Sequence, residues 1–135
     1  MAQIPSTEGH LAAYHGIDIA LDTFPYHGTT TTFEALWMGA PVVTLAGEAH
    51  VARVGVSILS RMGLPELIAN TPEDYVSIAV DLAGDLPKLQ ELRRTMRQRM
   101  EAHGLLDGKI ITRELEAAYA DMWRCYCAKQ SGSKL

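Results

Sequence analysis

The fold is decided by residues 17–45, which read IDIALDTFPYHGTTTTFEALWMGAPVVTL. Residues 17–22 alternate between apolar and polar side chains, which predicts a strand. Residues 31–38 carry large apolar side chains at helical spacing, and a following glycine and proline end that helix. The compact apolar run at residues 41–45 predicts a second strand, covered on both faces. A strand, a helix and a second strand in this order are typical of a parallel sheet.

The sequence on both sides continues this alternation. A hydroxyl at Ser6 or Thr7 can cap a short helix that reaches about His15. Downstream, the pattern predicts a short third strand at 66–69 and helices at 52–62, 72–83, 86–102 and 112–129. Known doubly wound sheets contain about five or six strands. The predicted fold class is therefore α/β, with a partial Rossmann-like parallel sheet and additional C-terminal helices.

Composition limits the domain organisation and the classes of partner. The chain has 135 residues, which is enough for one domain over residues 1–130, with a disordered tail expected at 131–135. A formal net charge of -4 offers no basic surplus for binding nucleic acid. No apolar run is long enough to cross a bilayer, and no N-terminal secretory signal is recognisable. We therefore expect neither a nucleic-acid partner nor a membrane partner.

The cysteines bear on compartment and on metal binding. Cys125 and Cys127 are separated by a single residue, so a disulfide between them would be strained. Unbridged thiols are typical of the reducing cytoplasm, where we expect the protein to reside. No cysteine and histidine spacing is typical of a zinc site, and no metal site is predicted.

Two loops leave the predicted strands at the carboxyl edge of the sheet, where open parallel sheets bind ligands. In the first loop, Gly28 allows close approach to the backbone, and residues 29–32 are threonines at a helix N-terminus. Such an N-terminus binds phosphate through its unpaired N–H groups and its positive dipole end. The alternative interpretation is that the threonines are only redundant helix caps.

Glu34, in the first turn of the same helix, also has two interpretations. Its carboxylate could turn back toward the cap residue Thr31 in a capping box. It also lies about one turn from a phosphate bound at the helix N-terminus, where a carboxylate can accept hydrogen bonds from two vicinal ribose hydroxyls.

The remaining polar residues of the two loops give weaker signals. His27 and His50 either contact a bound ligand or bond to backbone and water. Arg53 either counters phosphate charge or forms a surface ion pair. Asp22 is expected to order the N–H groups of the first loop. None of these residues is a convincing general base.

Two features of the C-terminal half are expected to be structural. Tyr119 and Trp123 share one face of the last predicted helix, and the simplest interpretation places them in the core. The arginines at 93, 94, 97 and 99 are expected to form a solvated or domain-facing stripe on the preceding helix.

Residues 24–47, FPYHGTTTTFEALWMGAPVVTLAG, closely resemble the C-terminal catalytic segment of the protein O-GlcNAc transferase family. The FPY-x-GTTTT form is most similar to its SPINDLY-like and bacterial TPR-linked members. The similarity extends from about His10 through Trp123, and the block at 34–43 recurs more loosely across GT-B glycosyltransferases. The resemblance implies that the chain is the C-terminal half of a GT-B donor-binding domain, from an inverting transferase that needs no metal.

The resemblance also implies roles for particular residues. Thr30 and Thr31, with Gly28 and Thr29 beside them, match the segment that binds the donor diphosphate. Glu34 matches a position of the family pattern that binds the ribose hydroxyls. His10 matches a position that lies against the nucleobase. The substrate would be a nucleotide sugar, with no cofactor, and His27 and His50 are further candidate donor contacts.

One position leaves the donor sugar open. Thr29 stands where the animal enzymes have histidine, although threonine fits the GTTTT subgroup. The O-GlcNAc branch uses UDP-GlcNAc, whereas plant SPINDLY, which the chain also resembles, uses GDP-fucose. The resemblance implies that GlcNAc or fucose is transferred to Ser/Thr hydroxyls of proteins.

The family pattern further implies that the protein acceptor is bound by regions N-terminal to this segment. These are a TPR array, a first catalytic lobe and a phosphate-binding lysine early in the second lobe. We therefore expect the segment to be inactive by itself. A different hypothesis is a non-catalytic, partner-dependent or truncated α/β module without nucleotide binding, which forms a homodimer through an exposed sheet edge. A small oxidoreductase is disfavoured, because no G-x-G-x-x-G motif follows a strand.

Overall fold

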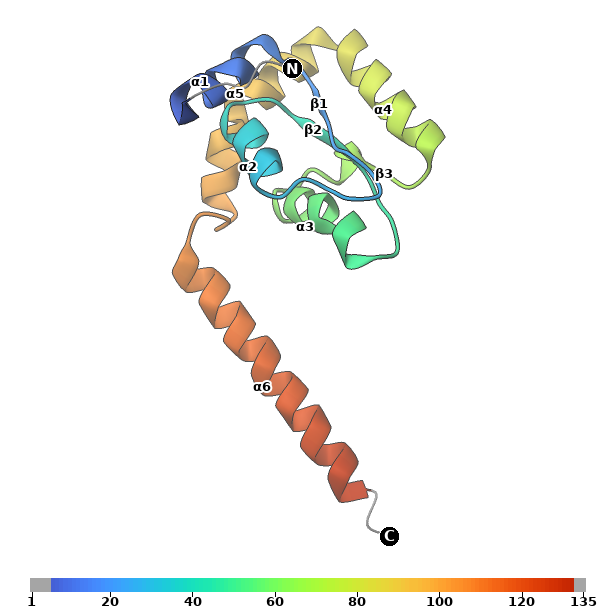
Figure 1. Ribbon diagram of the computed structural model, residues 1–135, viewed down its shortest axis with the longest axis vertical. Helices are drawn as coiled ribbons and strands as arrows, with labels where there is room; N and C mark the ends of the chain where they lie inside the picture. The colour runs from blue at the N-terminus through green and yellow to red at the C-terminus, as the bar shows by residue number, and fades with distance from the viewer. Residues whose placement is uncertain (1–5, 133–135) are drawn as a thin grey trace.

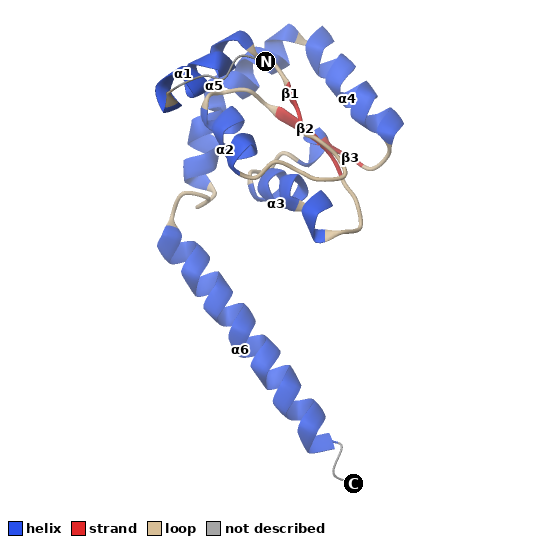
Figure 2. Ribbon diagram, viewed as in Figure 1, coloured by secondary structure: helices blue, strands red, loops and turns tan. Residues whose placement is uncertain are grey.

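The computed structural model describes residues 6–132, and its centre is a parallel sheet of three short strands (Figures 1 and 2). The strands are β1 (Ala20–Leu21), β2 (Val42–Leu45) and β3 (Ile68–Ala69), in the order β1-β2-β3. The predicted α/β class with a partial parallel sheet is therefore confirmed. The predictions for residues 1–5 and for the tail at 133–135 lie outside the described residues.

Six α-helices accompany the sheet in the described part of the chain. They are α1 (Thr7–Ala12), α2 (Thr30–Trp37), α3 (Val54–Arg61), α4 (Pro72–Gly84), α5 (Leu86–Ala102) and α6 (Gly108–Gly132), with 3-10 turns at Ala13–Gly16, His50–Ala52 and Pro65–Leu67. Local capping chemistry explains several starts, since Ser6, Thr71 and Asp85 each accept a hydrogen bond from the backbone N–H three residues later. The last helix runs to residue 132, two residues into the tail that was expected to be disordered.

β1 is much shorter than the strand predicted at residues 17–22. The guanidinium of Arg93, on α5, donates to the carbonyl oxygens of Ile17 at 2.6 Å and of Asp18 at 3.0 Å. Those carbonyls are therefore turned toward α5 instead of joining the ladder. The N–H groups of Ala20 and Asp22 donate to the carbonyls of Pro41, directly before β2, and of Val43, within it.

The core lies between the sheet and the helices that cover it. α2 and α3 lie on one side of the strands and α4 on the other, while α5 packs against both α2 and α4 (Figure 1). The side chains in the core are almost entirely aliphatic or methionine; the largest fully buried ones include Leu36, Leu59, Met62, Leu64, Leu67, Met96 and Met100. The sheet and the helices that pack on it are called the body below. Burial of these side chains supplies most of the stability of the body.

The arginine stripe of α5 faces this body only in part. Arg97 lies over the ring of Trp37, 5.2 Å from its centroid, and its Nε donates to the Trp37 carbonyl at 2.5 Å. Arg94 instead pairs with Glu91 on its own helix. The arginines of the stripe therefore have different surroundings: Arg97 contacts α2, Arg93 contacts the segment before β1, and Arg94 faces solvent.

α6 projects away from the body (Figure 1). Its base is held by Arg61, which donates to the His103 carbonyl and forms a two-pronged ion pair with Glu114. Beyond that point its apolar face is exposed: Trp123 retains 65% of its accessible surface, and Tyr119 is also exposed. The prediction that these two residues belong to the core is wrong, because helical spacing marks an apolar face but does not identify what covers it.

The membrane prediction rests on hydropathy. Within residues 6–132, no helix combines the length and the apolar character needed to cross a bilayer.

Two leucine substitutions test how the core is divided between the body and α6. Leu92 on α5 is 5% exposed, whereas Leu115 on α6 is 50% exposed. We expect Leu92→Ala to lower the free energy of unfolding by about 2–5 kcal/mol, because it leaves a cavity among packed side chains. The matched Leu115→Ala should change it by less than about 0.5 kcal/mol. Urea unfolding followed by circular dichroism measures both, and equal losses would contradict an exposed α6.

Candidate functional site

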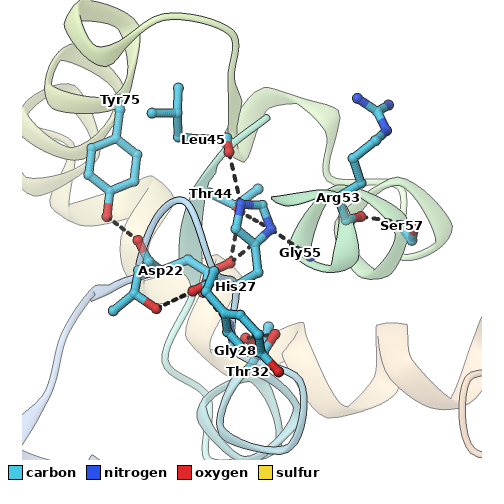
Figure 3. A network of polar contacts seen from close by, with 12 residues as sticks. Asp22, His27, Gly28, Thr32, Thr44, Leu45, Arg53, Gly55, Ser57 and Tyr75 are labelled. Atoms are coloured by element: carbon cyan, nitrogen blue, oxygen red, sulfur yellow. Dashed lines mark hydrogen bonds and ion pairs between the residues drawn. The ribbon is translucent and has the colours of Figure 1, made fainter. Parts of the chain in front are cut away.

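A buried polar network lies at the carboxyl ends of β1 and β2 (Figure 3). Asp22, directly after β1, accepts hydrogen bonds from the Gly28 N–H at 2.8 Å and from the Thr44 hydroxyl at 2.8 Å. The hydroxyl of Tyr75, on α4, donates to the Asp22 carbonyl at 2.7 Å. Asp22 therefore orders the first loop as predicted, and it also ties that loop to β2 and α4.

His27 occupies the middle of this network and is 1% exposed. The Gly55 N–H donates to its Nδ1 at 3.1 Å, so Nδ1 carries no hydrogen. Nε2 therefore carries the hydrogen and donates to the Leu45 carbonyl at 2.9 Å. The Asp22 carboxylate, 3.5 Å from Nδ1, is a close neighbour of the ring. Both ring nitrogens are occupied inside the protein, so the ring does not face the surface where a ligand would bind.

Two glycines allow the loops to pack this tightly. A Cβ on Gly55 would lie 2.5 Å from Asp22 Oδ2 and even closer to the Thr44 hydroxyl. A Cβ on Gly28 would lie 2.5 Å from the Thr31 hydroxyl. At both positions, close approach requires glycine.

α2 begins directly after the first loop, with Thr29 as its N-cap. The Thr29 side chain makes no capping hydrogen bond, and the first intrahelical bond runs from the Phe33 N–H to the Thr29 carbonyl. The N–H groups of residues 30–32 precede that bond and have no intrahelical acceptor. Within the described residues, the hydroxyls of Thr30 and Thr31 also form no hydrogen bond. The N-terminus of α2 thus presents unpaired donors, as an anion site requires.

Glu34 forms no capping box, because the cap is Thr29 and not Thr31. Its Oε2 lies 3.0 Å from His10 Nε2 instead, which brings together α1 and α2. The His10 ring also packs against the Tyr14 ring in a T-shaped pair, with a centroid separation of 5.8 Å. Burial, together with the Glu34 carboxylate, raises the pKa of Tyr14. The sequence patterns gave no indication of Tyr14, whose hydroxyl also donates to the Thr31 carbonyl at 3.3 Å.

Three surface pockets adjoin the N-terminus of α2; the smallest, of about 160 Å³, is lined in part by Gly28 and Thr31, and the two larger ones differ in polarity. One, of about 330 Å³, lies between the two loops and is lined in part by Thr29, His50 and Arg53. The other, of about 460 Å³, is mostly apolar and includes Thr30 and Glu34 in its lining. The predicted site residues therefore gather around one helix end, with the exception of the buried His27 ring.

The charge at this site is unusual for an anion site. Arg53 Nη1 donates to the Gly47 carbonyl at 3.1 Å, which holds its side chain against the second loop, and Arg53 forms no ion pair with any of residues 6–132. Among residues 6–132, no group of three or more histidine, cysteine or acidic side chains is arranged to hold a metal ion. Any anion bound here meets chiefly backbone amides, hydroxyls and a helix dipole.

Comparison with known proteins identifies relatives over nearly the whole chain. The family model for glycosyl transferase family 41 matches residues 1–115. A probable UDP-N-acetylglucosamine–peptide N-acetylglucosaminyltransferase SPINDLY from Hordeum vulgare is 52% identical over 118 residues, which are 87% of this chain and 12% of the relative. The UDP-N-acetylglucosamine–peptide N-acetylglucosaminyltransferase of Caenorhabditis elegans is 34% identical over 93% of this chain and 11% of its own length.

A solved structure supports the same grouping. A mutant O-GlcNAc transferase from Thermobaculum terrenum superposes with a TM-score of 0.81 and 45% sequence identity. The match covers 96% of this chain and 25% of that one. The chain thus spans about an eighth of the plant relative and a quarter of the bacterial structure.

Because the network is closely packed, we expect an added methyl group to lower the free energy of unfolding at Gly55 but not at an open position. Gly55→Ala should lower the free energy of unfolding by about 1–3 kcal/mol, because the Asp22 and Thr44 oxygens must move apart. At Gly84, the last residue of α4, a Cβ would meet nothing within 4 Å. Gly84→Ala should therefore be neutral or stabilise by up to about 1 kcal/mol. Thermal unfolding of both variants measures the difference, and similar stability would contradict the tight contact at Gly55.

Proposed function

The chain belongs to glycosyl transferase family 41, and we propose that it supplies the donor-binding half of a nucleotide-sugar site. The observation that carries this proposal is the N-terminus of α2, where unpaired amides and the Thr30 and Thr31 hydroxyls lie together. In that position they bind the diphosphate of the donor, with Gly28 and Thr29 beside them. The positive end of the helix stabilises the diphosphate as it leaves with its developing charge.

The rest of the nucleotide extends from this point toward α1. Glu34 accepts hydrogen bonds from the ribose hydroxyls, and His10 lies against the nucleobase. The 3.0 Å contact between the two side chains supports this proposal, because it holds both within reach of a single nucleoside. His50, in the pocket between the loops, is a further donor contact toward the sugar.

The chemistry proposed for the whole protein is transfer of a sugar from a nucleotide diphosphate to Ser/Thr hydroxyls of proteins. The sugar is GlcNAc from UDP-GlcNAc or fucose from GDP-fucose, and no cofactor takes part. The names of the plant and nematode relatives favour the UDP donor. The protein acceptor and the catalytic base would be supplied by regions outside this chain, including a TPR array. We place the protein in the cytoplasm.

A second candidate function is a non-catalytic module that pairs with a partner or with a second copy. The outer edge of β1 favours it, because among the described residues β1 pairs only with β2 and its Leu21 is 56% exposed. Such an edge is a template for another strand. This candidate predicts a dimer by light scattering and no nucleotide binding.

A titration of the isotope-labelled chain with UDP and with GDP, followed by amide NMR, tests the donor site. We expect millimolar binding that shifts the amide signals of residues 28–34. Thr30→Val with Thr31→Val should weaken it at least about tenfold, since each hydrogen bond to a charged group contributes about 1.5–3 kcal/mol. The nucleotide that binds more tightly identifies the base.

The control is a double variant that makes the same chemical change away from the site. Thr95→Val with Thr112→Val removes two hydroxyls that donate to backbone carbonyls on α5 and α6. It should leave the nucleotide affinity unchanged. Equal affinity of the two double variants would reject the anion site at α2.

A further inference from the structure

His27 has no place in the proposed donor contacts, although it is the most deeply buried titratable side chain of the network. We propose that His27 is a positioning residue that fixes two loops relative to one another. The first loop comprises residues 22–29 and the second comprises residues 46–53. By fixing them, His27 sets the shape of the pocket that they share. The consequence for ligand binding rests on the proposed function, whereas the coupling of the loops does not.

His27 makes one hydrogen bond inside the second loop and one to a residue on each side of that loop. Its side-chain Nε2 donates to the carbonyl of Leu45, the residue before that loop. Its backbone N–H donates to the carbonyl of Val51, inside the loop, at 2.9 Å. Its Nδ1 accepts from the N–H of Gly55, just beyond the loop on α3. One residue of the first loop therefore holds the second loop from within and from both sides; Figure 3 shows the contacts with Leu45 and Gly55.

Burial makes these bonds hard to exchange. The His27 side chain has no exposed surface, so water cannot replace a lost partner without opening the network. A buried donor or acceptor left without a partner loses its hydration without compensation, which destabilises the folded state. The two loops are thus confined to one relative arrangement as long as the ring stays in place.

The walls of the shared pocket are the direct neighbours of these contacts. Thr29 lies two residues after His27 on the first loop, while His50 precedes Val51 on the second. Arg53, which also lines the pocket of about 330 Å³, lies two residues before Gly55. A shift at His27 is therefore transmitted to both walls, and to Thr29 as the N-cap of α2.

Three variants separate positioning from general stability. His27→Phe keeps a ring of similar size and removes both side-chain bonds. His27→Asn keeps an acceptor oxygen where Nδ1 lies, so it can still accept from the Gly55 N–H. Leu92→Ala damages the core on α5, outside both loops.

The measurement is the affinity for UDP in the amide NMR titration. We expect His27→Phe to weaken binding about tenfold, the equivalent of one unsatisfied buried group, and His27→Asn to weaken it less than about threefold. Leu92→Ala should leave the affinity unchanged wherever the chain remains folded. The proposal is overturned if His27→Phe binds as the wild type does, or if His27→Asn fails to restore binding.

A readout without ligand distinguishes this proposal from the proposed function. If the wild-type chain binds neither UDP nor GDP, the proposed function fails, and the amide positions of the free variants decide the positioning role. His27→Phe should then shift the signals of Thr29, His50 and Arg53 together, whereas His27→Asn should shift them far less. Shifts confined to residues 26–28 would overturn it.

A measurement on the wild type covers the case in which His27→Phe does not fold. Long-range nitrogen–proton NMR of the imidazole ring should show hydrogen on Nε2 and none on Nδ1. Hydrogen on Nδ1 would exclude the bond from Gly55 and overturn the proposal.

Discussion

A buried carboxylate must obtain hydrogen bonds from its surroundings, and Asp22 obtains them from two separate segments of the chain. One oxygen takes the Gly28 N–H and the other takes the Thr44 hydroxyl. Left without these partners, a charged group at this depth would cost several kcal/mol. The need to satisfy one side chain thus brings the loop after β1 back onto β2. The position of α2 follows from that return, since α2 begins two residues after Gly28.

This constraint explains why the N-terminus of α2 stays available. The polar groups inside the loop satisfy one another, as the Thr32 hydroxyl does by donating to the Gly28 carbonyl at 2.9 Å. The hydroxyls of Thr30 and Thr31 are not drawn into this network. A rigid interior and unpaired donors at its edge are complementary features, because donors that are held in place lose little entropy when an anion binds.

The main elements, and the gathering of the candidate site residues at one helix end, could be predicted from local signals. The apolar run of β2, the caps at Thr71 and Asp85 and the unusual threonine run all act over a few residues. The failures involve contacts between distant segments. Arg93 shortens β1 although it lies 75 residues after Asp18 in the sequence, and no residue near Asp18 indicates this contact.

His27 illustrates the same limit within the site. In sequence it is a histidine in a polar loop, which suits a ligand contact as well as an internal bond. Its role is set by Gly55, which lies 28 residues further on and could not be paired with it from spacing alone. For α6, the prediction of an amphipathic helix is correct, but the prediction that its apolar face is buried is wrong. The periodicity of apolar residues identifies the apolar face of a helix, but burial also requires a second surface that packs against that face.

If this chain binds a diphosphate as proposed, the charge of the site makes that binding weak. The donors are amides and hydroxyls, and Arg53 is turned onto the Gly47 carbonyl. The whole chain carries a formal net charge of -4, so its long-range field does not attract an anion. A helix end contributes about half a unit charge, far less than a diphosphate carries. Because this chain matches only about an eighth of the length of its plant relatives, the balancing cation can come from the remainder. Under the proposed function, the fold of this segment would position the phosphates, and most of the binding energy would come from the rest of the protein.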